Sequence, residues 1–159
     1  MPENELKNNQ TDPDKPGSDK SGNSEPIRLL LVDDEKGFAN VISKRLRKRN
    51  IDVATTYSGS EAIKVLRKKK FDVAVLDLKM EDMNGIEVLK IFKTMAPDLS
   101  VVMLTGHGSE QAARDGIALG AVDYLTKPCD FGELVDKIRE AFKIRKEKIV
   151  NEKGLNKEK

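Results

Sequence analysis

The sequence predicts one α/β domain built on a five-stranded parallel sheet with helices on both faces. Five short apolar runs alternate strictly with segments whose apolar residues repeat at helical spacing, and the connections between them are short. Parallel neighbours require covering helices and right-handed crossovers. A chain of 159 residues is long enough for one domain with a substantial core. We place this domain at residues 26–145.

The first half of the domain contains two strand–helix units. Residues 27–32 have the length and β-branched content of a buried parallel strand. Apolar spacing then predicts a helix over residues 38–49, with Asn50 marking its end. Residues 52–56 form a second short strand. A capping serine and a glycine precede a helix over 61–69.

The third unit carries a carboxylate at its strand end. The apolar run 71–76 leads directly into Asp77, and a loop over 78–85 follows. Residues 86–96 then repeat apolar side chains at helical spacing, and Pro97 ends this helix.

Two further units complete the alternation. The fourth strand is predicted at residues 101–104 and the fifth strand at residues 122–125. The helix between them, over 110–119, is weakened by Gly116 and by short side chains. An apolar stripe over 134–142 predicts the last helix.

The two ends of the chain differ from the domain in composition. Residues 1–25 have few apolar side chains, so we expect a disordered tail. The charged extension 146–159 either continues the last helix or forms a frayed end. No signal peptide or run of about 18 apolar residues is present, so we expect no membrane span and a cytoplasmic location. The single Cys129 fits a reducing compartment, as a free structural thiol.

Basic residues cluster at 44–49, at 67–70 and near the last residues. Both internal clusters fall at the predicted C-terminal ends of helices, where the helix dipole favours cations. We therefore expect no direct nucleic-acid binding.

Polar residues follow four of the five predicted strands. Asp33 and Asp34 follow the first strand, Asp77 the third, Thr105 the fourth and Lys127 the fifth. Each has an ordinary explanation as a cap, a turn residue or a surface lysine. Together they converge on the carboxyl edge of the sheet, where open α/β sheets bind ligands. Their joint placement predicts a functional site.

The chain resembles the receiver domain of bacterial response regulators over residues 27–145. The resemblance rests on the ordered motifs at residues 30–35 (LLVDDE), 75–78 (VLDL), 83–85 (MNG), 104–106 (LTG) and 123–128 (DYLTKP). It implies a flavodoxin-like, doubly wound sheet with strand order 2-1-3-4-5 and five helices.

The resemblance also implies the chemistry of the site. Asp77 would accept a phosphoryl group from a histidine kinase, a histidine phosphotransfer domain or a small donor such as acetyl phosphate. Neighbouring carboxylates repel one another, and the positive charge of Mg²⁺ would offset this repulsion. Mg²⁺ also prefers oxygen ligands. Asp34 and Asp77 would ligate Mg²⁺ directly, Asp33 through a water molecule, and Lys79 through its backbone carbonyl. Mn²⁺ or Ca²⁺ could fit the same groups.

The phosphoryl group has its own expected contacts. Lys127 and the hydroxyl of Thr105 would bind its oxygens, and the bond before Pro128 is cis in the family. Thr105 would then move inward and Tyr124 would turn toward the vacated space. This switch would change the face formed by the fourth helix, the fifth strand and the fifth helix, to which a downstream protein binds.

The chain departs from the family at three positions. The loop after the phosphoacceptor usually reads Met-Pro in the family, whereas here Glu81 follows Met80. Lys79 and His107 occupy the two positions that tune how long the phosphoryl group lasts. We expect Lys79 to shield phosphorylated Asp77 and slow its hydrolysis.

We expect the protein to be a phosphorylation-controlled switch and not an enzyme acting on an outside substrate. We expect it to be a monomer or a phosphorylation-dependent dimer. One alternative is a fragment of a larger DNA-binding transcription regulator. Another is a Mg²⁺-dependent phosphohydrolase with Asp77 as nucleophile. The haloacid-dehalogenase-like pattern disfavours the latter, because it has a second Asp where this chain has Lys79.

Overall fold

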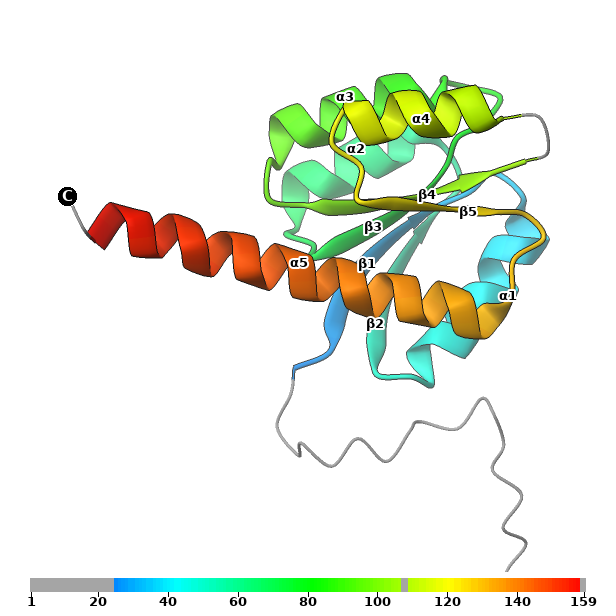
Figure 1. Ribbon diagram of the computed structural model, residues 1–159. Helices are drawn as coiled ribbons and strands as arrows, with labels where there is room; N and C mark the ends of the chain where they lie inside the picture. Colours follow the sequence, from blue (N-terminus) through cyan, green and yellow to red (C-terminus); the bar gives the residue numbers. More distant parts are fainter. Residues whose placement is uncertain (1–24, 107–108, 158–159) are drawn as a thin grey trace, which may run out of the picture.

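The computed structural model describes residues 25–106 and 109–157, with side chains as far as residue 154. The expected disordered tail, apart from its last residue, and His107 lie outside the described residues. Five strands and five helices alternate along the described chain (Figure 1). In order, they are β1 (Ile27–Val32), α1 (Lys36–Arg47), β2 (Ile51–Thr56), α2 (Gly59–Lys68), β3 (Val73–Asp77), α3 (Gly85–Met95), β4 (Ser100–Thr105), α4 (Glu110–Ala118), β5 (Asp123–Thr126) and α5 (Phe131–Lys157).

The five strands form one parallel sheet in the order β2-β1-β3-β4-β5. Helices α1 and α5 cover one face, and α2, α3 and α4 lie on the other (Figure 1). The expected flavodoxin-like fold, strand order and helix number are therefore confirmed.

Both faces of the central strands are buried. In β1, Leu29 and Leu31 pack under α1 and α5, whereas Leu30 and Val32 pack under α2 and α3. All four side chains are fully buried. A parallel sheet covered on both sides needs apolar residues at successive positions, which is why the strands appear in the sequence as continuous apolar runs.

Several element boundaries differ from the sequence prediction by one or two residues. Helix α1 ends at Arg47 because Asn50 adopts a left-handed conformation with a φ of 62°, which asparagine tolerates better than most residues. Strand β3 begins at Val73, two residues after the start of the predicted run at residue 71, and includes Asp77 as its last residue.

Helix α5 continues without interruption through the expected domain boundary at residue 145 and extends away from the sheet (Figure 1). The first part of the charged extension is helical, as far as Lys157. Ile144 and Val150 on this helix are exposed. Among the described residues, no helix is both long and apolar enough to cross a membrane.

The buried carboxylate of Asp72 links the start of the sheet to α5. The carboxylate of Asp72 accepts hydrogen bonds from the backbone N–H of Arg28 at 2.9 Å and from its guanidinium at 3.0 and 3.3 Å. Arg145 Nη1 on α5 lies 3.2 Å from Asp72 Oδ1. Burial alone would raise the pKa of Asp72, but the hydrogen bonds and charge of Arg28, with the charge of Arg145, lower it below its ordinary value.

Replacing Asp72 with Asn is expected to lower the free energy of unfolding at neutral pH by about 2 kcal/mol, allowing for the partial exposure of Arg28. Because the pKa of Asp72 is lowered in the folded state, the unfolded state binds more protons than the folded state as the pH falls below 3.8. The contribution of Asp72 is thus present above that pH and lost as the pH falls through the folded-state pKa. Urea unfolding across this range measures the difference.

The exposed Asp52 on β2 provides the control, since Asp52→Asn should change stability little at any pH. A difference between wild type and Asp72→Asn that stays constant down to low pH would contradict the ionic role of Asp72.

Candidate functional site

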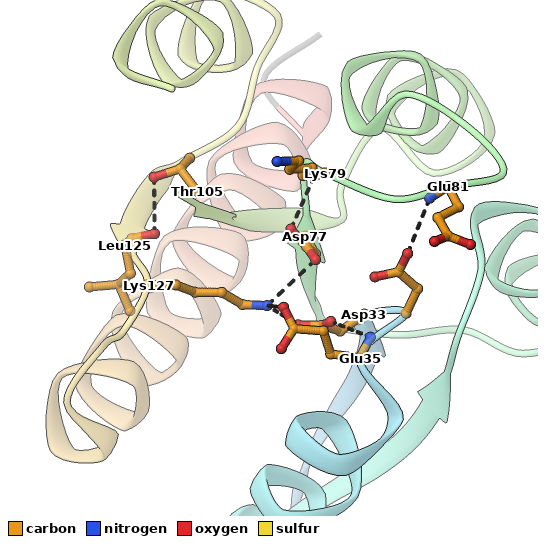
Figure 2. Close-up of polar contacts among 9 residues, drawn as sticks. Asp33, Glu35, Asp77, Lys79, Glu81, Thr105, Leu125 and Lys127 are labelled. Carbon is orange, nitrogen blue, oxygen red and sulfur yellow. Dashed lines mark hydrogen bonds and ion pairs between the residues drawn. The ribbon is translucent and has the colours of Figure 1, made fainter. Parts of the chain in front are cut away.

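The predicted site residues lie at the carboxyl edge of the sheet. Asp33 follows β1, Asp77 ends β3, Thr105 ends β4 and Lys127 follows β5. Parallel strands in register bring these ends together, so residues far apart in the chain become neighbours (Figure 2). The convergence expected from the sequence is present for these four residues.

The ammonium group of Lys127 lies among three carboxylates (Figure 2). Lys127 Nζ is 2.7 Å from Asp33 Oδ2, 3.4 Å from Glu35 Oε1 and 3.5 Å from Asp77 Oδ2. Asp33 and Asp77 are buried, and the Lys127 side chain is only 17% exposed. One cation therefore balances part of the negative charge of two buried carboxylates and of the exposed Glu35.

Burial and charge shift two pKa values in this cluster. Burial raises the pKa of Asp77 to about 6, and the negative charge of Asp33 adds to the rise, although the Lys79 N–H and Lys127 oppose it. Burial lowers the pKa of Lys127, but the hydrogen bond to Asp33 and the charges of Asp77, Asp33 and Glu35 outweigh this and raise it above its ordinary value. Lys127 thus remains a cation, while ionised Asp77 needs further positive charge nearby.

Backbone N–H groups orient the two buried carboxylates. Asp33 Oδ1 accepts a hydrogen bond from the Glu35 N–H at 2.9 Å, and Asp77 Oδ1 accepts one from the Lys79 N–H at 3.0 Å (Figure 2). Each bond joins a residue to the one two positions later, as aspartates often do where a strand gives way to a turn. The second oxygen of each carboxylate faces Lys127.

Asp34 lies outside this group. Its Oδ2 accepts a hydrogen bond from the backbone N–H of Glu81 at 3.1 Å. Among the described residues, Asp33, Glu35 and Asp77 form a group of three carboxylates whose oxygens all lie within 4.8 Å of one another. Glu35 had no role in the sequence prediction, although it belongs to the first motif. Its place directly after the acidic pair was the only signal for it.

The two predicted switch residues differ in their exposure. Thr105 is buried, and its hydroxyl donates to the carbonyl of Leu125 at 3.3 Å (Figure 2). Tyr124 is 42% exposed. The backbone N–H of Lys127 donates to the carbonyl of Thr105 at 2.6 Å, and the bond between Lys127 and Pro128 is cis, in agreement with the expectation. The Lys79 side chain is exposed beside Asp77.

The cluster suits a hard divalent cation. Asp33, Glu35 and Asp77 offer carboxylate oxygens close to one another, and Mg²⁺, Mn²⁺ and Ca²⁺ bind oxygen ligands of this kind. Asp77 is buried and its ionised form is disfavoured, so a cation would stabilise it.

A separate basic cavity lies at the opposite edge of the sheet. It has a volume of about 450 Å³ and is lined by residues 66–71, residues 95–99 and Arg145, near the starts of β3 and β4. It contains none of the predicted site residues.

The combination of this sheet with an acidic group and a lysine at its carboxyl edge defines the class of receiver-type α/β domains. Residues 29–139 match the response regulator receiver domain family, and the chain belongs to that family. It is thus a receiver domain of two-component systems.

Individual relatives agree with this assignment. The chain is 34% identical over 116 residues to the transcriptional regulatory protein ZraR of Salmonella typhimurium, covering 73% of this chain and 26% of that protein. It is 37% identical over 106 residues to the photosynthetic apparatus regulatory protein RegA of Cereibacter sphaeroides, covering 67% and 58%. The receiver domain of the Francisella response regulator 1452 superimposes with a TM-score of 0.69 at 30% identity, covering 74% and 97%. The chain spans about a quarter of the length of ZraR.

Proposed function

We propose that this protein is a phosphorylation-controlled switch in which Asp77 accepts a phosphoryl group from a histidine kinase or a histidine phosphotransfer domain. The observation that carries the proposal is the buried carboxylate of Asp77 at the end of β3, with its Oδ2 facing Lys127 and the neighbouring carboxylate of Asp33. The protein acts on itself and on no outside substrate. Since such partners act in the cytoplasm, we place the protein there as part of the proposal.

In the transfer, a carboxylate oxygen of Asp77 forms a bond to phosphorus. The bond between phosphorus and the donor imidazole nitrogen breaks, and its electron pair stays on that nitrogen. Lys127 provides a positive charge for one phosphoryl oxygen, and the Thr105 hydroxyl donates a hydrogen bond to another. These roles need positioning and charge, which phosphoryl transfer chiefly requires.

Asp33, Asp34, Asp77 and the backbone carbonyl of Lys79 would hold Mg²⁺, and Glu35 offers a further oxygen. When bound, the cation offsets the negative charge of the carboxylates and of the phosphoryl oxygens.

The switch begins at Thr105. Its hydroxyl donates a long hydrogen bond of 3.3 Å to the carbonyl of Leu125. After phosphorylation it donates to a charged phosphoryl oxygen instead. Tyr124, exposed on β5, then turns toward the space that Thr105 leaves. Ile117 and Leu119 on and after α4 are also exposed, so this face offers apolar contacts to a downstream protein. The domain is a monomer or dimerises upon phosphorylation.

A second candidate is the receiver part of a larger transcription regulator. Its support is that the chain spans 26% of ZraR, a transcriptional regulatory protein. In that case DNA binding belongs to another part of the protein, and the receiver itself contacts no nucleic acid. A phosphohydrolase acting on outside substrates has less support, because Lys79 stands where that pattern needs a second carboxylate.

Incubation with Mg²⁺ and acetyl phosphate, followed by intact-mass measurement, tests the main proposal. One phosphoryl group per chain is expected, without turnover of unrelated phosphate esters. Steady hydrolysis of such esters would favour the phosphohydrolase.

Lys79→Asn is expected to shorten the lifetime of the phosphorylated protein several-fold. The Lys79 ammonium is exposed beside Asp77 and can approach the phosphoryl oxygens, whereas an asparagine amide can orient an attacking water. Phosphate release after removal of acetyl phosphate gives the half-life. A half-life that is unchanged or longer in Lys79→Asn would exclude the shielding role.

A further inference from the structure

Asp34 differs from the other carboxylates of the predicted cation site in its hydrogen-bond partner. Asp33 and Asp77 each accept from an N–H two residues ahead, within their own turn. Asp34 Oδ2 accepts from Glu81, which is 47 residues away on the loop between β3 and α3. This contact holds the Asp34 carboxylate toward that loop, outside the group formed by Asp33, Glu35 and Asp77.

The donor is a backbone N–H that exists because residue 81 is not a proline. The sequence departs from the usual Met-Pro pattern of the family at this position. Proline has no N–H and could not make this bond. The contact with Asp34 is therefore a consequence of Glu81, and it depends on the backbone of that residue and not on its side chain.

The loop that carries Glu81 is fixed from the other side. Asp82 Oδ1 accepts from the Gly59 N–H, and Asp82 Oδ2 accepts from the N–H and the hydroxyl of Ser60, all at 3.1 Å. These bonds attach the loop to the first turn of α2, where the helix dipole favours a carboxylate. A bridge between Lys79 and Asn84 closes the base of the loop. These contacts oppose a movement of the Glu81 N–H toward the acidic group.

We propose that the backbone N–H of Glu81 is a latch that restrains Asp34 and competes with a divalent cation for its carboxylate. The inference rests on the proposed function, because it assumes that Asp34 ligates the cation. Binding of the cation breaks the hydrogen bond from Glu81 to Asp34 while Asp82 keeps the loop on α2. The latch therefore weakens the affinity of the site for the cation. It also makes the hydrogen bonding of the loop depend on whether a cation is bound.

The test is calorimetric titration of the purified protein with Mg²⁺ alone, comparing Glu81→Pro with Glu81→Ala. Both variants lose the carboxylate of residue 81, but only the proline variant loses the N–H. The dissociation constant for Mg²⁺ is expected to fall about tenfold in Glu81→Pro, which corresponds to about 1.4 kcal/mol. In Glu81→Ala it should stay within about twofold of wild type, since its N–H remains.

An equal affinity in the two variants, or a weaker affinity in Glu81→Pro, would overturn the latch. In the latter case the N–H would position Asp34 for the cation. If wild type and both variants fail to bind Mg²⁺, it is the cation site of the proposed function that is wrong.

An NMR measurement on the wild-type protein avoids any disturbance of the loop by proline. The Glu81 amide is expected to shift and to exchange its proton faster when Mg²⁺ saturates the protein, because it loses its acceptor. The Ser60 amide should keep its protection. A Glu81 amide that stays equally protected with Mg²⁺ bound contradicts the proposal.

Discussion

Asp77→Asn is expected to abolish incorporation of a phosphoryl group from acetyl phosphate in the presence of Mg²⁺. The amide is nearly the same size as the carboxylate, so the packing at the end of β3 is kept. It lacks the anionic oxygen that attacks phosphorus, and it gives a cation one ligand fewer. Intact-mass measurement after incubation with acetyl phosphate should show the added group in wild type and none in the variant.

The matched control is Asp52→Asn, which makes the same chemical change at an exposed position on β2. It should be phosphorylated like wild type. Undiminished phosphorylation of Asp77→Asn would show that another residue accepts the phosphoryl group. Peptide mapping would then identify that residue. Far-UV circular dichroism of both variants verifies that loss of phosphorylation does not come from unfolding.

Gly85→Ala is expected to lower the free energy of unfolding by about 2–3 kcal/mol, because the added methyl group meets backbone and not a mobile side chain. A Cβ atom at residue 85 would lie 2.4 Å from the Cα of Leu78 and 2.8 Å from its carbonyl oxygen. The Gly85 N–H also donates to that carbonyl at 3.1 Å. Leu78 follows Asp77 directly, so the displaced backbone should slow phosphorylation as well. Urea unfolding and the rate of acetyl phosphate labelling measure the two effects.

Gly116→Ala on α4 is the comparison. A Cβ there would meet the Met103 side chain, with 2.1 Å to its sulfur. Methionine can change rotamer to make room, and alanine favours helix, so this variant should lose less stability than Gly85→Ala. Labelling of Asp77 should stay near the wild-type rate. If the two variants lose equal stability, the close approach of Gly85 to the Leu78 backbone is not the constraint we describe.

Much of the fold could be predicted because it depends on local patterns. Continuous apolar runs marked the strands, since the sheet is buried on both faces. The end of α1 came earlier than predicted because apolar spacing does not show where the backbone turns, here at Asn50. The charged end of α5 was ambiguous for a similar reason: its composition suits both a solvated helix and a frayed end.

Within the candidate site, the sequence alone determined which polar residues reach the carboxyl edge, because strand order and direction carry Asp33, Asp77 and Lys127 there. Only the tertiary structure decided their partners. Glu35 joined the group around Lys127 and Asp34 turned to the Glu81 N–H, across separations of 92 and 47 residues. Hydrogen bonds over such distances depend on how loops from different strands pack against one another, and no local pattern of residues encodes that packing.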